Sequence, residues 1–243
     1  MADEVENLDE QRKLEENPFA SLKISSFEVL RDAERSTCKK CKASRKYYCY
    51  KCFDVVGIER SMIPFVSLPL QVDIIKHKGE VMGKSTACHA AILAPDNVTI
   101  HHFPTIPQFK SKEKVILVYP SETALSLGDL EKKTSSNDCT HFDHVIFIDS
   151  TWDQTHSIIS DPRLADIQRV KLENATTYFW RPQRKPSTCL ATIEAVYYFF
   201  KEYQKYIMKS DYDGQFDNLL YFFVFQYLLI KQKKRKSKRQ KLE

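Results

Sequence analysis

Two uninterrupted apolar runs constrain the fold of this 243-residue chain more than any other feature. Residues 115–119 read VILVY, and residues 145–148 read VIFI and lead directly into Asp149. Continuous runs rich in β-branched residues are typical of strands buried on both faces of a parallel sheet. Residues 121–133, between the runs, have a helical composition, and strand, helix, strand is the unit of an α/β fold. We therefore predict an α/β fold with flanking helices.

The remaining elements fit the same fold class. The pattern predicts strands at 72–76 and 169–172, a long helix that starts at 186–188, and a last helix at about 216–231. Trp152, Ile158 and Ile159 indicate a short helix that Asp161-Pro162 closes. Ser187 or Thr188 is the expected N-cap of the long helix. The longest apolar run, residues 219–230, is shorter than the roughly 20 residues of a membrane span, so we expect a core helix and no membrane association.

The two ends of the chain differ in charge. From Lys231 onward there are eight Lys and Arg and one Glu, and the rest of the chain holds 29 basic and 31 acidic residues. Such a block is typical of a solvated, disordered segment that binds nucleic acid or acts as a nuclear address, so we expect a nuclear protein, with the cytoplasm as an additional location. Residues 1–22 are acidic, polar and unlike a signal peptide, and we expect a flexible extension.

Four of the seven cysteines form one cluster, Cys38-x2-Cys41-x7-Cys49-x2-Cys52. Without a secretory signal, disulfides are not expected. Each C-x2-C pair presents two thiolates to one ion, and four thiolates make the closed tetrahedral site of structural zinc. Free cysteines and an iron–sulfur cluster are the alternatives. Six Lys or Arg and three Tyr are interleaved with the cysteines, which fits either an RNA contact or a solvated basic surface.

Asp149 is the first candidate for a functional residue. It ends a predicted buried strand, and in open α/β sheets ligands bind just beyond the carboxyl ends of the strands. The alternative is that Asp149 caps the helix that follows it.

The residues around Asp149 resemble a known family. Asp149-Ser150-Thr151-Trp152 matches the D-x-T-W motif of the DTW-domain family of tRNA-uridine aminocarboxypropyltransferases. Other segments agree with the family in the same order: Ile75-Lys76-His77-x2-Glu80, Gly83-Lys84-Ser85-Thr86, Asp161-Pro162-Arg163-Leu164, Arg181, and Cys189-Leu190-Ala191-Thr192-Ile193-Glu194-Ala195. Ala191 departs from the pattern, since many relatives have Ser or Cys there. The resemblance covers roughly residues 37–230.

The resemblance implies a reaction and a fold. These enzymes transfer the 3-amino-3-carboxypropyl group of S-adenosylmethionine to N3 of a uridine in the tRNA D-loop. Their fold is similar to the SPOUT class of α/β proteins, in which the cofactor lies against a deep trefoil knot. The partner implied is tRNA, and the four-cysteine module, at the position where the family has it, is expected to be a small, zinc-ribbon-like unit.

The resemblance also implies roles for single residues. Asp149, Thr151 and Trp152 are the expected catalytic residues, with Asp149 either assisting proton removal or binding the ammonium group of the cofactor. Trp152 is expected either to stack on a base or to belong to the core. Cofactor contacts are expected from Asp149, Ser150, Thr151, Lys76, His77, Arg181, Thr192 and Glu194, with Arg184 and Lys185 as further candidates. Glu194 is either paired inside the protein or directed toward the site.

These patterns divide the chain into a flexible extension (1–22), a four-cysteine zinc module (23–60), a catalytic domain (61–230) and a basic disordered tail (231–243). Two other functions fit part of the sequence. One is an S-adenosylmethionine-dependent RNA methyltransferase of SPOUT type. The other is a non-enzymatic zinc-ribbon adaptor that binds RNA, which leaves the D-x-T-W turn unexplained.

Overall fold

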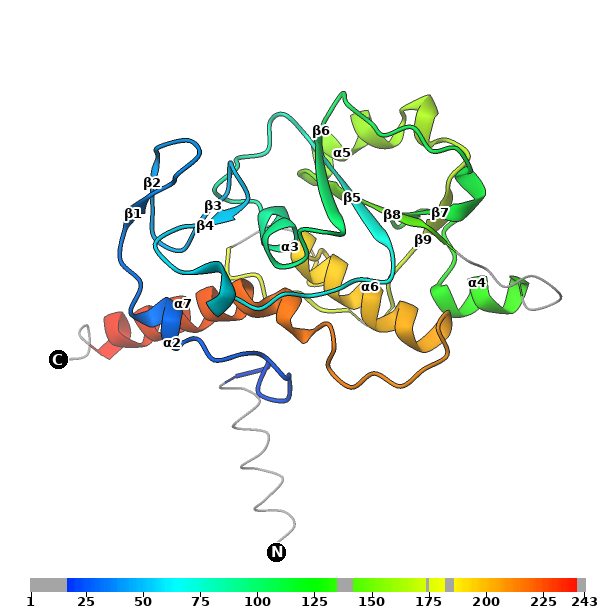
Figure 1. Cartoon of the computed structure of the whole chain (residues 1–243). Coiled ribbons are helices and arrows are strands. Elements are labelled where there is room, and N and C mark those ends of the chain that lie inside the picture. Colours follow the sequence, from blue (N-terminus) through cyan, green and yellow to red (C-terminus); the bar gives the residue numbers. More distant parts are fainter. Residues whose placement is uncertain (1–16, 135–141, 174, 182–185, 240–243) are drawn as a thin grey trace, which may run out of the picture.

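A five-stranded sheet forms the centre of the computed structural model, which describes residues 17–134, 142–173, 175–181 and 186–239 (Figure 1). The strands are β5 (Gln71–Lys76), β6 (Val98–His102), β7 (Val115–Val118), β8 (His144–Asp149) and β9 (Gln168–Val170). Their order is β6-β5-β8-β7-β9, and each neighbouring pair is parallel. The register sets Lys76 opposite Asp149, so both residues end their strands at the carboxyl edge.

The apolar runs predicted the middle of this sheet correctly. The strand predictions for β5, β7 and β8 are confirmed to within about a residue. The strand predicted at 169–172 lies at 168–170. β6 was not predicted, because it is an edge strand of mixed burial that ends in two histidines and has no continuous apolar run.

Helices cover both faces of the sheet. One face packs against α3 (Ala87–Leu93), α4 (Leu127–Thr134) and α6 (Thr192–Tyr206), which bury the side chains of Ile74, Ile116 and Phe147. The other face, which includes Ile75 and Ile146, packs against α5 (Trp152–Ile159) and the 3₁₀ turn η3 (Pro162–Leu164). Figure 1 shows α5 and α6 on opposite sides of the strands. The predicted fold class, α/β with flanking helices, is confirmed.

The long helix starts later than predicted, and its predicted caps are wrong. α6 begins at Thr192, and its N-cap is Ala191 rather than Ser187 or Thr188. An alanine side chain cannot cap, so other groups satisfy the free N–H groups of this helix end. The Glu194 carboxylate accepts from the Ala191 N–H at 2.8 Å, and the Thr86 hydroxyl accepts from the Ile193 N–H at 3.1 Å. Glu194 is a local partner at the capping-box position, whereas Thr86 is a tertiary partner that no local pattern encodes.

A small amino-terminal module packs against the end of the sheet domain. It contains α2 (Glu28–Arg31), the short strands β1 (Ser36–Thr37), β2 (Ser44–Arg45), β3 (Tyr48–Cys49) and β4 (Asp54–Val55), and the turn η1 (Arg60–Met62). The strands pair as two antiparallel hairpins, β1 with β2 and β3 with β4. Tyr48 lies against Phe222, with ring centroids 4.8 Å apart. A further turn, η2 (Lys112–Lys114), precedes β7.

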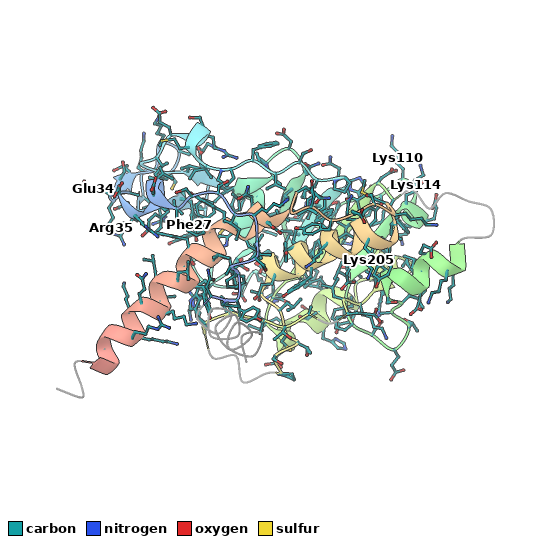
Figure 2. The ribbon with its side chains drawn as sticks, turned by 90° about the horizontal axis from the view of Figure 1, so that it is seen from below. Phe27, Glu34, Arg35, Lys110, Lys114 and Lys205 are labelled. Atoms are coloured by element: carbon teal, nitrogen blue, oxygen red, sulfur yellow. The ribbon has the colours of Figure 1, made fainter. Side chains whose placement is uncertain are left out.

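The carboxyl-terminal segment corrects one prediction. After the turn η4 (Asp217–Leu220), α7 runs from Tyr221 to Arg239, so the basic tail predicted to be disordered is helical through residue 239; residues 240–243 lie outside the described part. Lys and Arg are good helix formers, and a helix already nucleated by a packed segment propagates at little cost. Figure 2 shows the end of α7 projecting from the body, on the side of Glu34 and Arg35 and away from Lys110 and Lys114.

Two other findings concern the ends of the chain. Within the described residues, no helix has both the length and the apolar character that crossing a membrane requires. The boundary of the amino-terminal extension is also earlier than predicted, because Phe19 is buried and its ring contacts Phe223 and Tyr227 edge to face. Residues 17–22 therefore belong to the packed structure, and residues 1–16 lie outside the described part.

Candidate active site at the carboxyl edge of the sheet

Asp149 is a buried carboxylate that joins three other parts of the chain. Its side chain is 4% exposed. The Lys76 ammonium on β5 donates to Oδ2 at 2.8 Å, and the Ser85 hydroxyl donates to the same oxygen at 2.7 Å. The Thr192 hydroxyl, at the start of α6, donates to Oδ1 at 2.6 Å. Three donors, one of them charged, compensate the large cost of burying an ionised carboxylate.

The segment from His77 to Thr86 leaves β5 and returns to Asp149. The His77 N–H donates to the Asp149 carbonyl oxygen at 2.9 Å, and Ser85 contacts the carboxylate. Gly79 lies so close to α5 that an added Cβ would stand 2.8 Å from Nε2 of Gln154. The segment therefore forms a loop fixed at both ends to one residue. The His77 ring is engaged locally, since Nδ1 accepts from the Gly79 N–H at 3.1 Å.

Glu194 is paired inside the protein, which is one of the two alternatives that its sequence context left open. It is 2% exposed and accepts from the Thr177 hydroxyl at 2.6 Å, the Tyr178 N–H at 2.7 Å and the Ala191 N–H at 2.8 Å. Burial raises the pKa of this carboxyl, and the three donors oppose the rise. Glu194 thereby holds the segment that leads to Arg181 against the start of α6.

The residues of the D-x-T-W turn have distinct local contacts. Thr151 is the N-cap of α5, so the helix-capping alternative for Asp149 is wrong. The Ser150 hydroxyl lies 2.7 Å from the Thr155 hydroxyl, which itself donates to the Thr151 carbonyl oxygen at 2.9 Å. Thr151 is exposed at the edge of the site. Trp152 is the first residue of α5, and its side chain lies outside the described part of the structure.

Arg181 has an unsatisfied donor. Its Nη1 is buried, and no hydrogen-bond partner for it exists within the described residues. The guanidinium lies 5.7 Å from the ring centre of Phe179. A buried, unpaired guanidinium N–H is costly, so such a group is expected where an anionic ligand completes the site. Arg184 and Lys185 lie outside the described residues.

The structure thus gathers part of the predicted set around one carboxylate. Lys76 and Thr192 contact the Asp149 side chain, and His77 contacts its main chain, whereas Ser150, Thr151 and Glu194 make contacts of their own. Ser85 was missed as a site residue, although the Gly83-Lys84-Ser85-Thr86 stretch signalled it. Thr177 was missed too, and no sequence pattern singles it out.

The four cysteines converge as their spacing predicted. Within the described residues they are the one group with metal-ligating atoms in reach of a common ion, and their sulfurs all lie within 4.8 Å of one another. Four sulfurs around one zinc at 2.3 Å stand about 3.8 Å apart, whereas the four cysteines of an iron–sulfur cluster are divided among two or four iron atoms and enclose a larger group. Burial raises the pKa of Cys49, but the N–H groups of Lys51 and Cys52 and the neighbouring thiols bring it to about 6.

The cysteine module also forms part of the wall of the site. A small pocket is lined by Tyr50 and Phe53 of the module together with Lys76, Met82, Ser85, Cys88, Ile100 and His102. The Arg45 guanidinium stacks on the Tyr50 ring at 4.2 Å. Tyr50 in turn lies beside Gly83, where an added Cβ would be 3.6 Å from its ring. The module is therefore continuous with the loop that carries Ser85.

Comparison with known proteins shows the family of this chain. The DTW domain matches residues 46–231. Relatives from Mus musculus, Xenopus tropicalis and Homo sapiens carry the name tRNA-uridine aminocarboxypropyltransferase 1. The mouse protein is 42% identical over 257 residues, covering 89% of this chain and 84% of its own length. The frog protein is 41% identical (92% and 90% covered), and the human protein is 41% identical (90% and 86% covered). No solved structure matches significantly.

Proposed function

Because this chain belongs to the DTW-domain family, we propose that it is a tRNA-uridine aminocarboxypropyltransferase. The reaction is transfer of the 3-amino-3-carboxypropyl group of S-adenosylmethionine to N3 of a D-loop uridine. The observation that carries the proposal is identity of about 41% over nine-tenths of the chain to relatives of that name. The buried polar centre at the carboxyl edge of a parallel sheet, where ligands bind in such folds, supports it.

The reaction is a substitution at an sp3 carbon. The uridine N3 attacks the Cγ of the methionine moiety, the Cγ–S bond breaks, and methylthioadenosine leaves with the bonding electron pair on sulfur. Since a sulfonium is already a good leaving group, the protein has two tasks: it aligns N3, Cγ and sulfur, and it helps remove the N3 proton. The target uridine has to leave its stack to reach a site at this depth.

We assign the donor's amino-acid end to the surroundings of Asp149. The buried, unpaired Nη1 of Arg181 supports an ion pair with the carboxylate of the methionine moiety. Asp149 holds Lys76, Ser85 and Thr192 in place, and this fixed array supports a role as the anchor of the donor site. We also assign Thr151, the N-cap of α5, and Trp152, its first residue, to the part of the site next to the donor and the uracil.

We propose that Cys38, Cys41, Cys49 and Cys52 hold one structural zinc ion. Their sulfurs form a closed set at distances that suit one tetrahedral ion, and Cys41 and Cys49 are 3.5 Å apart. The ion would supply the folding free energy that a module of this size lacks. We also propose that the sheet is SPOUT-like with a trefoil knot behind Asp149. Five parallel strands with crossovers support that class, and a crystal structure with bound S-adenosylmethionine tests it.

We propose that tRNA binds across the cysteine module and α7. The module presents cations beside aromatic rings, such as Arg45 on Tyr50 and Lys46 on Tyr47. Most of the described side chains from Lys231 to Arg235 are exposed on the projecting end of α7. Both surfaces suit phosphate and base contacts. The same basic block supports a nuclear location, which deletion of residues 231–243 and imaging of the cellular distribution test.

The decisive experiment incubates the protein with S-adenosylmethionine and unmodified tRNA and then measures the nucleosides by mass spectrometry. The proposal expects a uridine heavier by one aminocarboxypropyl group and stoichiometric methylthioadenosine. A methyl-sized increase with S-adenosylhomocysteine identifies a methyltransferase instead. Binding of tRNA without any product identifies a non-enzymatic adaptor and contradicts the proposal.

A further inference from the structure

Glu80 lies in the loop that is fixed to Asp149 at both ends. The loop leaves β5 through His77 and returns at Ser85, and both residues contact Asp149. Within it the Glu80 N–H donates to the His77 carbonyl oxygen at 3.0 Å, and the N–H groups of Lys84 and Ser85 donate to the Val81 carbonyl oxygen at 2.8 and 3.2 Å. These turns fix the backbone of Glu80 within the loop that contacts Asp149.

The two carboxylates of this region differ in their hydrogen bonding. Asp149 has both oxygens occupied by Lys76, Ser85 and Thr192. Glu80 is half-buried, and none of the described residues donates a hydrogen bond to its carboxylate. A carboxylate that already accepts three hydrogen bonds has little capacity to take a proton from a substrate, whereas an unoccupied one in the same region retains that capacity.

The electrostatic surroundings of Glu80 also suit a base. The charged groups that act on it are Asp149, Lys76, Lys84 and Arg181, from four different segments of the chain. Burial, and then the negative charge of Asp149, raise the pKa of Glu80, while the three cations oppose the rise. A raised pKa makes a carboxylate a stronger base at neutral pH, and such shifts concentrate at functional sites.

We infer that Glu80 is the general base that takes the N3 proton of the target uridine, an assignment that rests on the proposed function. The N3–H bond breaks as an O–H bond forms on the Glu80 carboxylate, and the N3 electron pair forms the bond to Cγ. The Cγ–S bond breaks, and its electrons remain on the sulfur of methylthioadenosine. The proton then passes from Glu80 to water, which restores the carboxylate. Asp149 acts beside it as a positioning residue.

The test compares Glu80→Gln with Glu113→Gln in single turnover at saturating S-adenosylmethionine and tRNA. Glu113 is an exposed carboxylate ahead of β7, at the opposite edge of the sheet, so its variant controls for loss of one negative charge. Glu80→Gln should lower the rate by about 100-fold or more, a typical contribution of a general base. Its cofactor affinity and melting temperature should be unchanged or higher, because an unpaired, partly buried charge is removed.

A pH series adds a second readout. The wild-type rate should rise with pH and level off above the pKa of Glu80, whereas the residual rate of Glu80→Gln should continue to rise as hydroxide replaces the base. A Glu80→Gln variant with the wild-type rate overturns the inference, and so does one that loses mainly cofactor affinity, which would assign Glu80 to the ammonium group of the donor. If wild-type protein forms no aminocarboxypropyl-uridine, the proposed function fails and this inference fails with it.

Discussion

Replacing Asp149 by Asn tests whether this carboxylate holds the site together. The substitution keeps the shape of the side chain but removes its charge, so the buried Lys76 ammonium loses the carboxylate with which it forms its ion pair. Both side chains are almost fully buried, 6% and 4% exposed, and the pair is 2.8 Å apart. Breaking such a pair from one side costs about 3–5 kcal/mol. For a chain of this size, that corresponds to a fall in melting temperature of roughly 6–20 °C.

The assay is urea denaturation of four proteins: the wild type, Asp149→Asn, Lys76→Met and the double variant. Because the second substitution removes the ammonium that the first leaves unpaired, the double variant should lose less stability than the sum of the single losses. Asp166→Asn is the matched control, since it breaks an exposed pair with Lys112 at 3.3 Å and should cost about 0–1 kcal/mol. An Asp149→Asn variant within about 1 kcal/mol of the wild type, with additive losses in the cycle, would refute the anchoring role.

Three further predictions follow from other parts of the molecule. The double variant Cys41→Ser, Cys49→Ser should bind no zinc in elemental analysis, and its residues 23–60 should become sensitive to proteolysis because the module unfolds. Wild-type protein that contains no zinc would contradict this prediction. Deleting residues 231–243 should weaken tRNA binding and reduce the slope of log affinity against log salt concentration. An unchanged slope would exclude phosphate contacts in this segment. Burial raises the pKa of Glu202 from 4.5 to about 7, because the folded state disfavours the charged carboxylate. The contribution of this side chain to stability is therefore greatest below pH 4.5, and it is lost as the pH rises through 7 and the carboxyl ionises in the folded protein. Glu202→Gln should therefore stabilise the protein at pH 8, by roughly 1 kcal/mol after allowance for solvent screening, and leave stability at pH 4 unchanged.

The sequence predicted the elements whose signal is local. Residues 115–117 and 145–147 of the two apolar runs are buried on both faces, and such a continuous run predicts a strand without reference to the rest of the chain. The paired cysteines encode their own convergence, because each C-x2-C turn brings two sulfurs together. The start of α6 was not predictable in this way. It depends in part on Thr86, which satisfies the Ile193 N–H at the helix end from 107 residues away, whereas the second partner, Glu194, is local.

The candidate site also combines residues that the sequence identifies with contacts that only the fold shows. The D-x-T-W motif and its neighbours identified Asp149, Lys76 and Thr192 through a resemblance to a family, and the structure places these side chains in contact. Their hydrogen bonds could not be read from sequence, because each donor comes from a different segment. Only the fold shows that Ser85 shares an oxygen of Asp149 with Lys76, and that Glu194 is directed toward Thr177 and Tyr178.

These contacts change what the D-x-T-W motif indicates about the role of Asp149. A residue that joins β5, β8, the loop at 77–86 and α6 would be retained in a family for assembly of the site, whether or not it takes part in proton transfer. Loss of activity in an Asp149 variant is therefore expected under either role and does not identify the base. The informative comparison is between Asp149→Asn, which should lose stability and rate together, and Glu80→Gln, which should lose rate alone. Proton transfer belongs to the carboxylate whose removal slows the reaction without disturbing the fold.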